Sequence, residues 1–161
     1  MTENRFSGLQ LSDLGTGTGL AILGFRACAF GRQQCCRVAS GFGAALGEEA
    51  GDTLSDLMAL TVQVNHQGRR KIGLAGMGCL GVTHEEALIA KAFFATQALN
   101  ERGAQSHLTT LLGREPTPQI SLLMSRISDT FAGYGLAFGD PDAAQSSSKT
   151  SPSKHQNQSS D

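Results

Sequence analysis

The chain has 161 residues, including 20 Gly and no Trp; 17% of its residues are charged, and its formal net charge is −1. This length fits one domain with a hydrophobic core and excludes a large multidomain enzyme. The near-neutral charge disfavours nucleic acid and anionic membranes as partners, because the chain has no excess of Lys and Arg to attract them.

The two ends of the chain differ in composition from the middle. The N-terminus lacks the basic and apolar regions of a secretory signal, and no stretch approaches the ~20 apolar residues that span a bilayer. We therefore expect a cytoplasmic protein without a membrane partner. The Ser-rich residues 140–161 contain no Leu, Ile, Val, Met or aromatic residue, which predicts a disordered tail. Residues 1–8 are also expected to be disordered, which leaves a single helical domain over residues 9–139.

The first half of this domain is predicted to be helical. Over residues 52–67, apolar side chains recur at helical spacing, and Gly68 follows where a left-handed C-terminal cap is favoured. Residues 20–30 and 33–46 are predicted to form two further helices. We expect the glycines in and between these two helices to permit close contacts between helices.

The second half is predicted to contain one short strand and three helices. Alternating polar and apolar residues indicate a strand over 70–74 that enters a Gly-rich turn. Thr83 and Glu86 have the spacing of a capping box, so a helix should start there and continue to Gly103. Two more helices are expected, over residues 106–112, ended by Gly113, and over residues 119–134. The fold class is therefore mostly α, a compact bundle of five or six helices with at most one short strand or hairpin.

A Gly-Thr repeat near the N-terminus is the first candidate for ligand binding. Asp13 is followed by Gly15, Gly17 and Gly19, directly before an apolar helix. This pattern is similar to the first motif of S-adenosylmethionine-dependent methyltransferases, in which the glycines let the backbone approach the ligand at a helix N-terminus. Only about ten residues carry the similarity, and the strands of that α/β fold are not predicted elsewhere.

The cysteines are the second candidate site, for a metal ion or for thiol chemistry. Cys28, Cys35, Cys36 and Cys79, with His84, form no pattern of metal-ligand spacing. Cys28 and Cys35 on one helix would lie about 10 Å apart, too far to share an ion. Cys79 could be activated by a nearby helix N-terminus and paired with His84, but no third orienting group is evident. Packed, reduced thiols are the favoured interpretation.

Four short segments together resemble small alphaproteobacterial helical domains of unknown function. They are the Arg69–Ile72 segment, the Gly-rich turn with Cys79, the Thr83–Ala87 helix start and Leu111–Gly113. The resemblance covers residues 20–138 and implies a helical domain without a known activity. Those domains carry a Cys-Cys-Cys-Pro-like turn where this chain has a single cysteine. That departure weakens a metal or redox role, because one thiol cannot hold a structural ion.

The favoured function is a small non-enzymatic regulatory or adaptor module that binds another protein, without a cofactor. The basis is a modest helical core that lacks a complete set of catalytic residues. Two alternatives stay open, so whether the protein is an enzyme is not decided. One is a methyltransferase-like or nucleotide-binding protein that uses the Gly15–Gly19 loop, and the other is a Cys/His metal-binding protein. The identity of the partner and the oligomeric state are not determined by the sequence.

Overall fold

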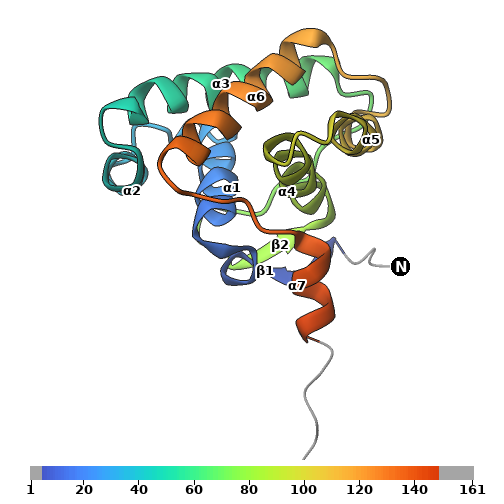
Figure 1. The fold of residues 1–161 in the computed structure, drawn as a ribbon, viewed down its shortest axis with the longest axis horizontal. Coiled ribbons are helices and arrows are strands. Elements are labelled where there is room, and N and C mark those ends of the chain that lie inside the picture. The colour runs from blue at the N-terminus through green and yellow to red at the C-terminus, as the bar shows by residue number, and fades with distance from the viewer. Residues whose placement is uncertain (1–4, 149–161) are drawn as a thin grey trace, which may run out of the picture.

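A computed structural model describes residues 5–148, in which the chain forms seven α-helices, two short 3-10 helices and a two-stranded sheet (Figure 1). In chain order the elements are β1 (Phe6–Gln10), η1 (Leu11–Leu14), α1 (Gly15–Ala29), α2 (Cys36–Leu46), η2 (Gly47–Glu49), α3 (Ala50–Gln67), β2 (Gly81–Thr83), α4 (His84–Gln97), α5 (Glu101–Leu112), α6 (Pro118–Gly133) and α7 (Pro141–Ser148). The predicted mostly α fold is confirmed.

Helices α1, α3, α4 and α6 pack around one core. Helix α3 lies along α6, and α1 and α4 lie against this pair (Figure 1). The core consists of aliphatic side chains and a few phenylalanines, of which Phe93 and Phe131 both contact Phe138 with ring centroids 5.3 and 5.0 Å apart. Helix α2 packs on α3, whereas α5 packs almost entirely on α4. Among the helices, α5 therefore has one main neighbour, and its C-terminal end is also bonded to the segment after α3, where the Arg69 amide donates to the Leu112 carbonyl at 2.8 Å.

The single sheet lies elsewhere than the sequence predicts. Residues 70–74 form no strand, and β2 comes seven residues later, paired antiparallel with β1 so that Phe6 lies opposite Thr83. Strand β1 also overlaps residues 1–8, and α7 lies within residues 140–161, so both segments expected to be disordered are partly ordered. The rest of those two segments, residues 1–4 and 149–161, lies outside the described residues.

The helix predicted from Thr83 to Gly103 is two helices. Its start is confirmed, because the Thr83 hydroxyl accepts the Glu86 amide at 3.1 Å while the Glu86 carboxylate accepts the Thr83 amide at 3.0 Å. The helix ends at Gln97, however, and Gly103 lies inside α5. Gly113 has the left-handed conformation expected of a C-terminal cap, whereas Gly68 is extended.

Close contact with α1 depends on Gly24, a glycine that the sequence did not single out. A Cβ atom on Gly24 would lie 2.8 Å from Leu57 Cδ1 and would overlap the Phe42 ring, so α2 and α3 can approach α1 only because this side chain is absent. In contrast, a Cβ on Gly31 or Gly43 would have open space, and a Cβ on Gly41 would lie 3.9 Å from Leu20 Cδ1, an ordinary contact distance. These three glycines, which lie in and between the two predicted helices 20–30 and 33–46, are therefore not required for close helix contacts, and that prediction is wrong.

Within the described residues, no helix combines the length and the apolar character needed to cross a membrane.

The contrast between the two helical glycines is testable by denaturation. We expect Gly24→Ala to destabilise the fold by about 1–3 kcal/mol, because the added methyl group overpacks the core. Gly43→Ala should stabilise it by about 0.5–1 kcal/mol, because alanine restricts the unfolded chain and meets no neighbour. Urea denaturation followed by circular dichroism measures both. Equal effects of the two substitutions would contradict this account of the core.

Candidate functional site

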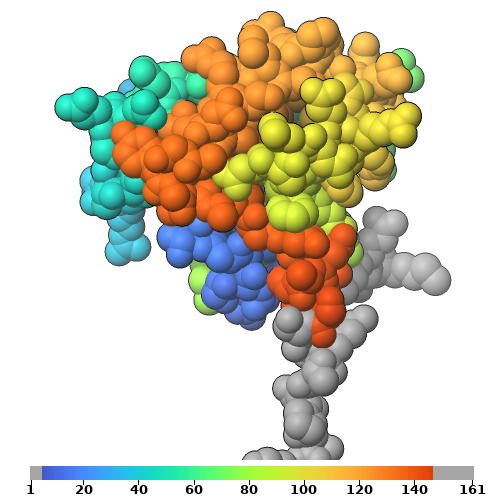
Figure 2. Space-filling model, viewed as in Figure 1, coloured from blue at the N-terminus to red at the C-terminus, as the bar shows by residue number. Residues whose placement is uncertain are grey.

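In the structure the Gly-Thr repeat forms the start of a helix. Helix α1 begins at Gly15 and therefore includes Gly17 and Gly19. The chain after α6 crosses the start of α1, where the Gly139 amide donates to the Thr18 hydroxyl at 3.1 Å. Figure 2 shows this C-terminal segment lying against the blue N-terminal elements.

The contacts of these residues are made by the protein itself. A Cβ on Gly17 would lie 2.9 Å from the carbonyl oxygen of Ala137, so this glycine permits the close approach of the C-terminal segment. The carboxylate of Asp13 accepts the Gln10 amide at 2.8 Å and caps η1. Gly17 and Asp13 therefore have structural roles in the described fold, whereas a Cβ on Gly15 would have open space.

The four cysteines and His84 do not come together as metal ligands. Among residues 5–148, no group of three or more Cys, His, Asp or Glu side chains could hold a metal ion. Cys28 is buried on α1, whereas Cys36 is exposed at the start of α2. Cys79 lies in the turn before β2, and the exposed His84 is the first residue of α4.

The pKa values of two of the thiols are shifted in opposite directions. Burial raises the pKa of Cys28 to about 11, because desolvation disfavours the thiolate. Cys35 is the residue before α2, where the backbone N–H groups of Arg37 and then Val38 stabilise the thiolate and lower its pKa. Cys28 is therefore an inert packed thiol, whereas Cys35 is the more reactive one.

The Gly-rich turn around Cys79 is fixed by a buried arginine. The Arg26 side chain, on α1, is fully buried and forms a bidentate ion pair with Glu86 of α4, with N–O distances of 2.6 and 2.8 Å. Its remaining N–H groups donate to the carbonyl oxygens of Cys79 at 2.7 Å, Gly81 at 2.8 Å and Gly76 at 3.5 Å. Arg26 thus satisfies carbonyl groups of the irregular segment before β2 and of Gly81, the first residue of β2.

Glu86 completes this network from the other side. Besides Arg26, its carboxylate accepts the backbone amides of Ala75 at 3.1 Å and Thr83 at 3.0 Å. All five N–H donors of the guanidinium are engaged within the protein. The network is therefore structural and leaves no donor for a substrate. The sequence signal for it is a lone arginine inside the apolar segment 20–30.

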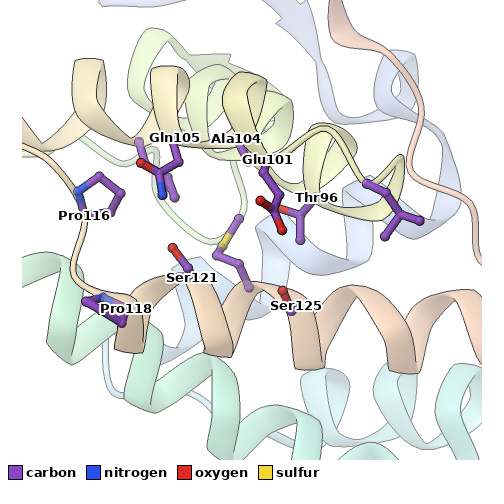
Figure 3. A pocket seen from close by; sticks show the side chains of 11 residues that line it. Thr96, Glu101, Ala104, Gln105, Pro116, Pro118, Ser121 and Ser125 are labelled. Carbon is purple, nitrogen blue, oxygen red and sulfur yellow. The ribbon is translucent and has the colours of Figure 1, made fainter.

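A groove of about 390 Å³ between α5 and α6 is the best candidate for binding. This volume is at the low end of the range for ligand pockets, about 300–1,000 Å³. Figure 3 shows Glu101 and Gln105 of α5 facing Ser121 and Ser125 of α6, with prolines at one end. The complete lining is Thr96, Leu99, Glu101, Ala104, Gln105, Leu108, Pro116, Pro118, Ser121, Met124 and Ser125.

Most of the polar side chains in the groove make no hydrogen bond or ion pair with the described residues. This is true of Glu101, Gln105, Ser121 and Ser125, whereas the Thr96 hydroxyl donates to the Ala92 carbonyl at 2.7 Å. The buried part of the lining is apolar and consists of Ala104, Leu108 and Met124. A few free polar groups around an apolar floor are typical of binding sites.

Leu99 forms one edge of the groove and has an unusual backbone conformation. With φ at 58°, it is the only described residue other than glycine with a positive φ. The Asn100 amide donates to the Ala95 carbonyl at 2.8 Å and the Leu99 amide to the Thr96 carbonyl at 3.1 Å, the hydrogen bonds of a Schellman motif. Glycine usually occupies this position. Here the leucine side chain is 86% exposed.

Sequence analysis missed this groove because it predicted one continuous helix through Leu99 to Gly103. The available signal was Asn100, a favoured N-cap residue that stands three positions before Gly103. In the structure its side-chain oxygen accepts the Gly103 amide at 3.0 Å.

No protein-family model, curated protein or solved structure matches the chain.

The role of the buried ion pair is testable with a matched exposed pair. We expect Arg26→Met to destabilise the fold by about 3–5 kcal/mol, because it leaves the Glu86 carboxylate buried without its counter-ion. Arg126→Met breaks the exposed pair with Asp56, 3.1 Å apart, and should cost about 0–1 kcal/mol. Chemical denaturation measures both. Similar losses for the two variants would show that the Arg26 network does not stabilise the fold.

The opposite pKa shifts predict an order of thiol alkylation. In the folded protein, iodoacetamide should modify Cys35 before Cys28, and Cys28 should react only after denaturation. At pH 9 the Cys28 thiolate fraction is about 1%, since its pKa is about 11. Because the pKa of Cys35 is lowered, alkylation of Cys35 should reach its maximal rate at a lower pH than alkylation of a thiol with an ordinary pKa. Peptide mass spectrometry over time gives both rates, and rapid labelling of Cys28 in the folded state would contradict the assignment.

Proposed function

We propose that this protein is a non-enzymatic module that binds another protein, and that the partner docks in the groove between α5 and α6. The observation that carries this proposal is Leu99. An L-residue in the left-handed region costs about 1–2 kcal/mol, and an exposed leucine side chain gains almost no burial. Glycine at this position would satisfy the turn without either cost, so the leucine side chain is better explained by contact with a partner.

A second exposed leucine supports the same surface. Leu122, on α6, is 59% exposed. It lies four residues after Pro118 and three residues before Ser125, which both line the groove. Residues at these spacings share one side of a helix, so Leu122 extends the apolar edge of the groove. Exposed apolar side chains around a groove are typical of protein interaction sites.

The chemistry of the groove favours binding over catalysis. Glu101 is its single charged lining residue, and the serines Ser121 and Ser125 have no histidine or second carboxylate beside them in the lining. A nucleophile or a general acid needs such a partner within hydrogen-bond reach. The two alternative functions have weaker support: the start of α1 is covered by the chain after α6, and no metal-ligand group is present among residues 5–148.

Site-specific photo-crosslinking in the cells that make the protein tests this proposal. A benzophenone amino acid at Leu122 should give a discrete adduct with another protein. The same group at Leu80, which is 67% exposed beside β2 and away from the groove, should not give that adduct. Adding Leu99→Gly should reduce the adduct from position 122. An adduct that forms equally from both positions, or that is unaffected by Leu99→Gly, contradicts the proposal, as does the lack of any adduct.

Thermal denaturation controls for unfolding in the Leu99→Gly variant. Relief of the left-handed strain gains about 1–2 kcal/mol, and the greater freedom of glycine in the unfolded chain costs about 0.4–1 kcal/mol. We therefore expect a stability equal to that of the natural chain or up to about 1.6 kcal/mol higher. A clear loss of stability would show that Leu99 has a structural role instead.

A further inference from the structure

We propose that the partner presents a short amphipathic helix with basic side chains, and that this helix lies along the α5–α6 groove. This inference rests on the proposed function, because it specifies the partner of the same surface. It follows from the length of the groove, its floor and its charge.

The groove has the length of two helical turns. Its α5 wall extends from Glu101 to Leu108 and its α6 wall from Pro118 to Ser125. Seven residues of helix rise about 10 Å. A helix of the same length presents apolar side chains at positions i, i+3 or i+4, and i+7 to one groove. An extended peptide would span the same distance with only about three residues.

The floor accepts side chains and not a whole helix. Ala104, Leu108 and Met124 are buried at its base, and the total volume of about 390 Å³ fits a few apolar side chains. A docked helix therefore lies over the opening, along the groove, and inserts only its apolar side chains. The exposed side chain of Leu99 then packs against the flank of that helix, which removes it from water.

The charge of the groove favours a basic partner. The carboxylate of Glu101 has no ion-pair partner among the described residues. Asp129, also exposed, lies four residues beyond Ser125 on α6 and continues the same side of the helix. No Lys, Arg or His lines the groove. Lys or Arg side chains beside the apolar stripe of the partner would meet these acids.

The C-terminal end of this chain does not fit the same site. Residues 149–161 contain two Lys, but their sequence has no large apolar residue to fill the floor. A separate protein therefore matches the groove better than the chain's own end.

Three synthetic peptides of about 14 residues, four helical turns, serve as probes. The first contains Leu at helical spacing with Lys elsewhere, the second has Glu in place of every Lys, and the third is the Lys peptide with a central Pro. Each is titrated into the full ¹⁵N-labelled chain, and amide shifts locate the site. We expect the Lys peptide to shift amides of α5 and α6 and to bind at least tenfold more tightly than either of the others.

Variants of the chain test the contacts. Glu101→Gln should weaken the Lys peptide about two- to fivefold, whereas Glu48→Gln, on η2 and away from the groove, should not. Leu99→Gly should weaken it about fivefold or more, because the leucine loses its contact with the helix. Raising the salt from about 0.05 to 0.5 M should also weaken binding, because it screens the ion pairs.

Results that differ from these expectations contradict either the charge of the partner, its helical form or the whole inference. Tighter binding of the Glu peptide contradicts the charge assignment, and equal binding of the Pro peptide contradicts a helical partner. Shifts confined to another surface, or no binding of any peptide, overturn the whole inference. If the crosslink from position 122 still forms in that case and still depends on Leu99, the groove binds a protein of different chemistry and the proposed function stands.

Discussion

The buried ion pair between Arg26 and Glu86 is the interaction on which the rest of the structure depends. It joins the last turn of α1 to the first turn of α4, and through carbonyl groups it fixes the irregular turn that precedes β2. A charged pair is costly to bury unless hydrogen bonds satisfy it fully, and here they do. The position of β2, and of β1 paired with it, follows from this network.

Helix α4 connects this rigid network to the groove. Its first turn contains Glu86, and its last residue leads into the left-handed Leu99 and the reversal into α5. Because α5 packs almost entirely on α4, its other side stays open toward α6. The groove exists because α5, whose main helical neighbour is α4, faces α6, which packs on α3 and α4. Its walls are therefore regular and positioned by the core, while its edge carries exposed leucine side chains.

Local patterns predicted most of the helices correctly. The α3 segment was evident from periodic apolar residues, and the start of α4 from the spacing of Thr83 and Glu86, because each signal depends on side chains within two turns of one helix. The helix end at Gly113 is predicted for the same reason, whereas the left-handed cap predicted at Gly68 is wrong, because Gly68 is extended. The role of Gly17 is not evident from the Gly-Thr repeat, since the contact that explains this glycine is made by Ala137, far along the chain.

The sequence by itself determined a mostly α fold, the positions of most helix ends and the chemical character of the segments, because these depend on periodicity and on neighbouring residues. Only the tertiary structure decided which residue Arg26 pairs with, that β2 lies at residues 81–83, and that α5 and α6 leave a groove between them. These features depend on contacts between residues distant in the chain, and the periodicity of one segment holds no information about which segment will face it.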